Sequence, residues 1–558
     1  MLKNLILADL KFEYKEQNLL LEKFSIENKY KYIGFNLNSK KKSKARNYLI
    51  NLFKRLNLSL TYHLNDIHEL NYSRLQWQKI TYSWLFRFIC NYYDRYLLLK
   101  KIHKKVVVSE AVTKNFNPTP KDYSNFIDLS YSKNWNYFII LEILKNLNKN
   151  NFKLKKIKKK IINTKLISYL PQKENNFKNK AQNILSKFKN DNLFIQGIGV
   201  QKVDLIKLYL KLGFIPFKIN EFEKYNYSIP KNKKKRRGLN KFKTTNEFEV
   251  ILAKNILKHI PYSYYENFKE LLDVSKNLNY SPKNIFTGQL HINSDLFKIW
   301  ISTPEMNNKN LFIMSHGGNE FTNKSMELIN ELVISKKLLS IYQKKNKKTI
   351  NCSRTYLTNL NFKNKKKNII LIDIERPIYN DFRIGPSSAQ IVKSFNQNLN
   401  LINLIKKNKL IFKKFLLIPY KNEGYDSFKF YKKKINSSRI IKPKTALSFI
   451  NRNSISICKY PFTIYLQSLL VCPTILFISG DWEFNNYFKK NKKNLEKNNM
   501  LFYDEKKLYK HLELIQANPL KWWNSEKILK IRKEILKNVP KKNSVNDIAN
   551  QMKKLINV

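Results

Sequence analysis

The chain has 558 residues, more than a single hydrophobic core ordinarily supports, so the usual size of domains predicts several. Hydrophobic residues at 43% and aromatic residues at 13% exclude a disordered basic protein. The formal charge of +65, from 106 Lys and Arg against 41 Asp and Glu, favours nucleic acid or an anionic membrane as partner, although a genome rich in A and T would also enrich lysine.

In the N-terminal half, short apolar runs alternate with longer helical stretches. Strands are predicted at residues 32–37, 106–108 and 193–196, and helices at about 72–101 and 135–147. The lysine-rich runs 153–160, 231–237 and 343–348 are interpreted as solvated linkers or insertions, with contact to phosphates or anionic lipid as the alternative. The Gly-Ile-Gly sequence at 197–199 predicts a tight turn first and a phosphate cradle second.

The C-terminal half shows the pattern of a parallel sheet covered by helices. Predicted strands lie at residues 311–315, 369–374, 415–419, 455–459, 474–479 and 500–503. Predicted helices lie at residues 323–332, 387–405, 462–470 and 505–516. Six strands with helical crossovers predict one doubly wound domain. With a second sheet in the N-terminal half, the fold class is α/β with a cleft between two sheets.

Neither a disulfide framework nor a metal site is predicted. The four cysteines have no paired spacing, and the seven histidines form no ligand motif. The N-terminal segment meets charge too early for a signal peptide, which favours a reducing cytoplasm. The most apolar window, residues 461–480, contains Gln467 and Pro473, and it predicts a buried helix followed by a strand rather than a membrane span.

The apolar run 311–314 ends abruptly in Ser-His-Gly-Gly-Asn-Glu at residues 315–320. A strand that leads into such a turn places a titratable side chain and bare N–H groups at the carboxyl edge of a sheet, where α/β folds bind ligands. Gly317 and Gly318 would let the backbone approach a ligand closely, because they lack a Cβ. The alternative for His316 is a capping or packing role.

A series of short motifs extends along most of the chain. In the N-terminal half these are LNDIH (64–68), YSRLQW (72–77), SWL (83–85), YDRY (93–96) and SKNWN (132–136). In the C-terminal half they are SHGG (315–318), PY (419–420), GYD (424–426), YPFT (460–463), CPTILF (472–477), WE (482–483) and PLKWWNSE (519–526). In this order the motifs resemble those of the bacterial transferase family associated with surface-polysaccharide and O-antigen biosynthesis genes, over about residues 32–539.

The resemblance implies a GT-B-like glycosyltransferase fold, with two Rossmann-like domains facing a cleft and helical elaborations at the N-terminus. We expect an acceptor-binding domain at residues 1–300, a nucleotide-sugar donor domain at 301–540 and a C-terminal helix or tail at 541–558. Two positions depart from the family pattern as we read it. Gln467 stands where Glu is favoured, and Lys336 stands near an expected acidic residue.

The predicted catalytic residues are His316, as base or phosphate partner, and Glu320. The predicted donor-binding residues are Gly317, Gly318, Thr463, Gln467, Ser468, Asp481 and Glu483. Thr463 would cap a helix beginning near residue 464 and expose its N–H groups to a phosphate, with Ser468 one turn further in. Ordinary capping is the alternative for Thr463, and a solvated loop is the alternative for Asp481 and Glu483.

The predicted acceptor-binding residues lie on the helical stretch 72–101. They are Arg74, Trp77, Asp94 and Arg95. Trp77 and Trp84 are seven residues apart and share one helix face, so core packing is the alternative to a sugar platform.

The sequence therefore predicts a cytoplasmic transferase, peripheral on the inner membrane, that moves a sugar or sugar-like group from a nucleotide-sugar to a surface polysaccharide or lipid-linked acceptor. The expected partners are the nucleotide-sugar, the glycan or lipid-linked acceptor and an anionic membrane surface, with no metal or other cofactor and no nucleic acid. The alternatives are a basic RNA-binding or ribosome-associated protein and a catalytically inactive scaffold of glycan synthesis. The donor, the acceptor and the stereochemistry stay open.

Overall fold

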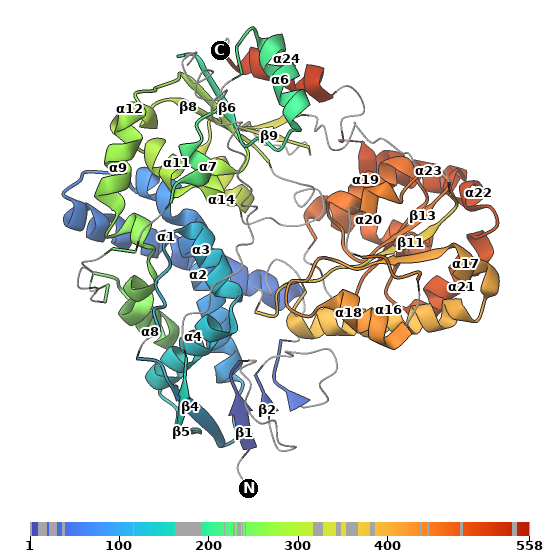
Figure 1. Cartoon of the computed structure of the whole chain (residues 1–558), viewed down its shortest axis with the longest axis horizontal. Coiled ribbons are helices and arrows are strands. Elements are labelled where there is room, and N and C mark those ends of the chain that lie inside the picture. Colours follow the sequence, from blue (N-terminus) through green and yellow to red (C-terminus); the bar gives the residue numbers. More distant parts are fainter. Residues whose placement is uncertain are drawn as a thin grey trace.

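The structure is a computed structural model that describes most of the chain, and three five-stranded parallel sheets organise it (Figure 1). The described residues are 3–8, 19–21, 31–35, 39–114, 116–161, 191–216, 218–226, 229–230, 236, 238–239, 241–315, 327–341, 347–352, 366–379, 386–435, 438–442, 446–479, 482, 484–537, 539 and 544–556. No helix within these ranges has the length and apolar character needed to cross a bilayer.

The N-terminal sheet has the strand order β3-β2-β1-β4-β5. Its strands are β1 (Lys3–Ile6), β2 (Leu19–Leu20), β3 (Lys31–Tyr32), β4 (Val106–Val112) and β5 (Phe152–Lys160). The helices of this part are α1 (Ser39–His68), α2 (Arg74–Lys100), α3 (Tyr123–Tyr131) and α4 (Lys133–Asn146). A capping box starts α2, because the Ser73 side chain accepts from the N–H of Gln76 and the Gln76 side chain accepts from the N–H of Ser73.

The middle sheet has the order β10-β9-β8-β7-β6. Its strands are β6 (Leu193–Gln196), β7 (Asn284–Thr287), β8 (Asn310–Met314), β9 (Lys337–Ser340) and β10 (Thr349–Asn351). Its helices are α6 (Lys202–Leu212), α7 (Glu221–Lys224), α8 (Glu247–Asn255), α9 (Phe268–Asn277), α10 (Leu290–Asn293), α11 (Asp295–Trp300), α12 (Pro304–Asn307) and α14 (Glu327–Ile334), with 3-10 turns at Ile256–His259 and Tyr262–Tyr264. The last helix of the chain, α24 (Ser544–Ile556), packs on α6 and shares its apolar core.

The C-terminal sheet has the order β12-β11-β13-β14-β15. Its strands are β11 (Ile369–Ile372), β12 (Phe415–Ile418), β13 (Ile455–Cys458), β14 (Thr474–Phe477) and β15 (Leu501–Phe502). Its helices are α16 (Ser388–Lys406), α17 (Lys409–Lys414), α18 (Ser427–Ile435), α19 (Thr463–Val471), α20 (Asn486–Lys497), α21 (Glu505–Ile515), α22 (Pro519–Trp523) and α23 (Glu526–Leu536). Helices α16 and α18 lie on one side of the sheet and α19, α20 and α23 on the other, so β11, β13 and β14 are buried on both faces (Figure 1).

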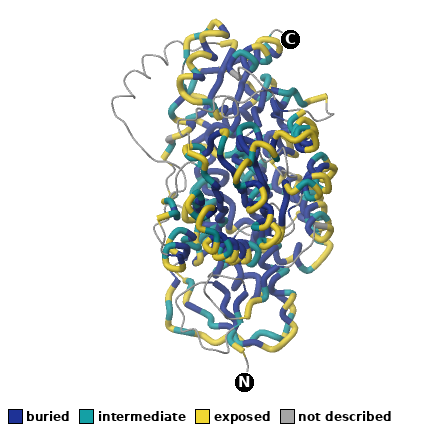
Figure 2. Tube along the Cα trace, turned by 90° about the vertical axis from the view of Figure 1, so that its right-hand side faces the viewer, coloured by how far each residue is buried: buried dark blue, intermediate teal, exposed yellow. Residues whose placement is uncertain are grey.

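The apolar cores divide the molecule into two bodies. One continuous core joins the N-terminal sheet and helices to one face of the middle sheet, and a second core lies between the other face of that sheet, α6 and α24. A separate core fills the C-terminal unit. Buried residues run through the interior of the trace and exposed ones lie on the outer turns of the helices (Figure 2). The C-terminal unit therefore has its own hydrophobic interior, as an independent domain does.

The predicted α/β class with parallel, Rossmann-like sheets is confirmed, but strand membership differs from the prediction. All six strands predicted in the C-terminal half exist, yet β8 belongs to the middle sheet, which leaves five in the C-terminal sheet. The middle sheet has strands on both sides of residue 300, and α24 belongs to its core rather than to a separate tail. We propose that the C-terminal unit covers residues 366–537.

The prediction that the lysine-rich run 153–160 is a linker is wrong, because these residues belong to strand β5. Among the described strands, β5 lies at the edge of its sheet and pairs with β4. Its many exposed lysines suit that position, since charged side chains on an edge strand oppose pairing with another chain. Of the run 231–237 only Arg236 is described, and it pairs with Glu266. The segments 343–346 and 231–235 lie outside the described residues.

A buried carboxylate ties the N-terminal helices to the middle unit. One oxygen of Asp295 accepts from the Tyr264 hydroxyl and the Lys298 ammonium, both at 2.7 Å. The other accepts from the Ser263 hydroxyl at 2.6 Å and from the backbone N–H of Tyr123, the first residue of α3, at 2.9 Å. Asp295 is 1% and Lys298 0% exposed, so the pair is held in an apolar surrounding and stays favourable only while every partner remains.

The Asp295→Asn variant should lower the free energy of unfolding by about 3–5 kcal/mol, because it removes the carboxylate that pairs directly with the buried Lys298 ammonium. Chemical denaturation followed by tryptophan fluorescence measures this loss, since Trp77, Trp84, Trp135 and Trp300 are buried in the same core. The control is Glu526→Gln, an exposed carboxylate on α23, which should leave this transition unchanged. An Asp295→Asn protein as stable as the wild type would contradict the role of the cluster.

Candidate functional site

The C-terminal sheet contains a topological switch point between β11 and β13. From β11 the chain goes to β12 on one side and then returns to β13 on the other. Open α/β sheets bind ligands outside the carboxyl ends of their strands at such a point. Here the two carboxyl ends are joined by a hydrogen bond of 3.0 Å from the N–H of Lys459 to the carbonyl of Ile372. This edge is the candidate site.

Two oppositely charged residues, Asp373 and Lys459, immediately follow the two strands of the switch point. Asp373 is fully buried and accepts from the Asn398 amide at 2.8 Å and the Tyr431 hydroxyl at 2.7 Å. Lys459 is 1% exposed, its ammonium lies 3.6 Å from the centre of the Phe477 ring, and no described residue accepts a hydrogen bond from it. A buried amine without an acceptor is costly, so this atom requires an explanation, and a bound anion would supply one.

Burial shifts the pKa values of both charged residues at the switch point toward neutrality. Burial raises the pKa of Asp373 to about 6, against the opposing effect of the Tyr431 hydrogen bond and the Lys459 charge. Burial lowers the pKa of Lys459 to about 7, against the opposing charges of Asp373 and Glu505. Such shifts are common among groups that bind ligands or move protons. No cluster of three His, Cys, Asp or Glu that could hold a metal occurs in the described part of the chain.

A second acid at this edge, Glu375, fixes the loop that follows β12. Its buried carboxylate accepts from four backbone N–H groups at 2.8–3.2 Å, those of Glu423, Tyr425, Asp426 and Ser427. Gly424 within this loop has φ +140°, a conformation that other residues rarely adopt. The GYD motif therefore has a structural role, which is to hold one wall of the carboxyl edge against the loop after β11.

Several predicted residues lie outside the described residues. These are His316, Gly317, Gly318, Glu320, Asp481 and Glu483. The strand that leads to His316 is β8, which belongs to the middle sheet, so the prediction that this strand is one of six in a single C-terminal domain is wrong. The Gly-Ile-Gly turn after β6 has positive φ at Gly197 (+70°) and Gly199 (+72°), as a tight turn requires.

Helix α19 starts at the candidate edge, directly after β13, but its side chains differ from the prediction. The N-cap is Phe462 and Thr463 is the first helical residue, so Thr463 does not cap the helix. Ser468 is fully buried and accepts from the Ser456 hydroxyl of β13 at 3.0 Å, so it packs against the sheet. Gln467 is also buried. The backbone N–H groups at the start of α19 therefore face the edge without a side-chain cap from Phe462.

The four predicted acceptor residues do not form one site. From residue 74 to residue 94 the helix α2 rises roughly 30 Å, which is longer than a sugar ligand of a few rings. Trp77 is fully buried and its indole N–H donates to Asn65 at 2.7 Å, as a core residue does. Arg74 is exposed and donates to the carbonyl of Lys54 at 2.9 Å.

Asp94 and Arg95, both buried, lie where α2 meets the C-terminal unit. The Arg95 guanidinium donates to the Asn136 side chain at 2.8 and 3.0 Å and to the carbonyl of Tyr379 at 2.8 Å. Tyr379 belongs to the segment that follows β11 and its carboxyl end. These two residues of the predicted set therefore lie beside a contact between the two bodies.

Asp373, Glu375 and Lys459 are site residues that were not predicted from the sequence. Each stands at the end of an apolar strand that it did predict, 369–374 or 455–459. The available signal was an isolated charge at the end of an otherwise apolar run, which in a parallel sheet falls on the ligand-binding edge.

Comparison with known proteins gives a family. The model of the LIC12162 family transferase matches residues 22–556. No functionally curated protein matches the chain. Two solved structures are similar to it with a TM-score of 0.34 each: Staphylococcus aureus MnaA in a co-structure with UDP, with 13% identity over 56% of this chain and 86% of that one, and a protein described as a UDP-N-acetylglucosamine 2-epimerase from Listeria monocytogenes, with 11% identity over 55% and 82%.

The Lys459→Met variant should be more stable than the wild type by about 1–4 kcal/mol at pH 6, because it removes a buried cation that lacks an acceptor. The folded pKa of about 7 lies below that of an unfolded lysine, so the cost of charging Lys459 is fully present below pH 7 and disappears as the pH rises toward 10.5. Chemical denaturation of both proteins at pH 6, 8 and 10 tests this, because the difference between their free energies of unfolding should become smaller as the pH rises. If this difference in unfolding free energy became larger as the pH rises, Lys459 would not be a buried cation without an acceptor.

Proposed function

We propose that this chain, which belongs to the LIC12162 family of transferases, transfers a sugar or sugar-like group from a nucleotide-sugar to a surface polysaccharide or lipid-linked acceptor. The family model matches nearly the whole chain, and the matched residues include strands of all three sheets. One observation carries the choice of donor. It is the buried, unaccepted ammonium of Lys459 at the switch point of the C-terminal sheet.

Lys459 and the start of α19 would hold the phosphates of the donor. Transfer breaks the bond between the anomeric carbon and a phosphate oxygen, and the nucleotide leaves with the electron pair and an added negative charge. An ammonium and the N-terminal N–H groups of a helix stabilise such a developing charge when they are fixed in place beforehand. The arriving phosphate would raise the pKa of Lys459 and keep it protonated.

The acceptor hydroxyl attacks the anomeric carbon and loses its proton to a base, for which we propose His316, with Glu320 beside it in sequence. Because β8 lies in the middle sheet, this base would come from the body opposite the donor unit. Catalysis between two bodies fits an acceptor side formed by the N-terminal and middle units and a donor side formed by residues 366–537.

The basic surface supports an acceptor at an anionic lipid surface, with a peripheral location on the inner membrane. Each lysine near such a surface contributes about 1 kcal/mol of attraction. The exposed lysines of β5 are one such group. The two departures from the family pattern are compatible with activity, because Gln467 is buried in α19 and Lys336 donates to Asn310 at 3.1 Å within the middle sheet.

A thermal-shift screen with UDP-, GDP-, CDP-, CMP- and ADP-sugars at two salt concentrations tests the donor. One nucleotide-sugar should raise the melting temperature at both salts, and Lys459→Met should weaken its binding at least about tenfold because a charge-assisted contact is lost. Lys393→Met, an exposed lysine on α16, is the matched control and should bind normally. His316→Ala should keep donor binding and lose transfer, if His316 acts only as the base.

The two alternatives predict different results in the same screen. Stabilisation by total RNA alone, fading between about 50 and 200 mM salt, would establish an RNA-binding protein instead. No stabilisation by any nucleotide-sugar would favour the inactive scaffold.

A further inference from the structure

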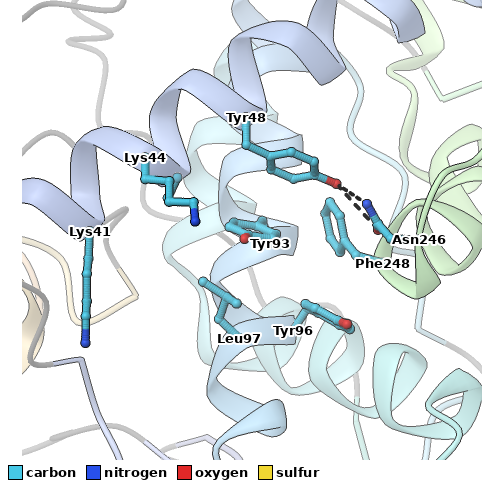
Figure 3. A pocket seen from close by; sticks show the side chains of 9 residues that line it. Lys41, Lys44, Tyr48, Tyr93, Tyr96, Leu97, Asn246 and Phe248 are labelled. Atoms are coloured by element: carbon cyan, nitrogen blue, oxygen red, sulfur yellow. Dashed lines mark hydrogen bonds between the residues drawn. The ribbon is translucent and has the colours of Figure 1, made fainter.

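A pocket of about 460 Å³ lies between α1, α2 and α8, in the N-terminal body and apart from the candidate donor site (Figure 3). Its lining residues are Lys41, Lys44, Ala45, Tyr48, Tyr93, Tyr96, Leu97, Asn246 and Phe248. Four of them are aromatic and two are lysines from the first turns of α1. We propose that this pocket binds one sugar ring of the acceptor that carries a negative charge, either a carboxylate or a phosphate.

The aromatic rings provide a surface for the apolar face of a sugar. Tyr93 packs against Tyr48 and Phe248 with ring centres 5.4 and 4.8 Å apart, and Tyr96 packs 5.2 Å from Phe248. Phe248 is 2% exposed, so it forms the floor, whereas the three tyrosines are half-buried. The C–H face of a pyranose ring is slightly positive and stacks on the negative face of an aromatic ring.

Fixed hydroxyl groups in the pocket can accept hydrogen bonds from a sugar. The Tyr48 hydroxyl donates to Glu249 and accepts from the Asn246 amide, both at 3.0 Å, which leaves one lone pair. The Tyr96 hydroxyl donates to Glu247 at 3.0 Å, and both of its lone pairs stay available to accept a hydrogen bond. Burial raises the pKa of both phenols, so they stay neutral. Their hydrogen bonds to Glu249 and Glu247 fix the orientation of the two hydroxyls before a ligand arrives.

The charge at the pocket mouth is positive. The two nearby acids are already paired, Glu249 with Arg55 and Glu247 with Lys100 at 3.0 Å. Lys44 is exposed and has no acidic partner among the described residues, and its side chain reaches toward Tyr93 in the pocket (Figure 3). A neutral sugar would leave this charge unused, whereas a carboxylate or phosphate would pair with it.

The position of the pocket suits an acceptor, and this part of the inference rests on the proposed function. Helix α1 begins shortly after Phe35, whose carbonyl accepts from the Ser387 hydroxyl of the C-terminal unit at 3.2 Å. Tyr96 and Leu97 directly follow Arg95, which bonds to Tyr379 of the same unit. The pocket is therefore flanked by both of these contacts with the unit that would carry the donor.

Saturation-transfer NMR on the full chain, with four probes, tests the inference. Methyl glucuronide and glucose 6-phosphate represent the two sources of charge, and methyl glucoside carries the ring alone. Inorganic phosphate carries the charge alone and, because it has no carbon-bound proton to observe, its affinity is measured by its competition with the sugar probes. We expect both charged sugars to bind, or the one whose source is correct, at least about tenfold more tightly than methyl glucoside or phosphate. Equal binding of inorganic phosphate would mean an adventitious anion site, and equal binding of methyl glucoside would refute the role of charge.

Three variants locate the binding. Lys44→Met should reduce the affinity for the charged sugars to that of methyl glucoside, and Ala45→Trp should fill the pocket and abolish binding of every probe. Lys54→Met is the matched control, because Lys54 is an exposed lysine of the same helix that does not line the pocket. Unchanged binding in folded Ala45→Trp protein would refute the site.

The same samples separate this inference from the proposed function. Donor stabilisation with no sugar binding in the pocket would overturn the pocket alone. Sugar binding that Ala45→Trp abolishes, without stabilisation by any nucleotide-sugar, would overturn the donor proposal and leave an anionic-sugar site.

Discussion

The carboxylate of Asp295 is the constraint on which the N-terminal body depends. It receives donors from α3, from the Tyr262–Tyr264 turn and from α11, so three segments that are distant in sequence must meet at one buried point. The apolar core around it continues into α2. Because α2 supplies both a wall of the aromatic pocket and the Arg95 contact with the C-terminal unit, the position of the proposed acceptor site follows from how that carboxylate is satisfied.

The buried charged residues at the carboxyl edge of the C-terminal sheet differ in whether they have hydrogen-bond partners. Glu375 has four backbone donors and Asp373 has two side-chain donors, as buried acids in stable structures usually do. Lys459, on the neighbouring strand end, has no acceptor within the described residues. Proteins generally keep such an unfavourable group only where function requires it, so the contrast separates a structural acid from a candidate ligand-binding base.

Much of the fold could be predicted from local pattern, because apolar runs bounded by turn residues mark strands such as β11 and β14 well. Sheet membership could not, since it depends on pairing between distant strands, and β8 pairs with β7 rather than with β11. The lysine-rich β5 was missed because its charge resembles that of a loop, although an edge strand tolerates it. Lys459 was seen only as the end of a strand, and its burial without an acceptor is a property of packing that the sequence does not display. The pocket unites residues 41–48, 93–97 and 246–248, a juxtaposition that no local pattern encodes.

The packing of α24 on α6 gives the C-terminal unit two tethers. The C-terminal unit lies in sequence between Cys352 and Ser544. Cys352 and the helix α24, which begins at Ser544, both pack in the apolar core of the middle sheet and α6. A unit held by one linker can pivot in any direction, whereas a unit held at two points turns mainly about the line that joins them. Any movement of the C-terminal unit relative to the other body is then restricted at both of these connections.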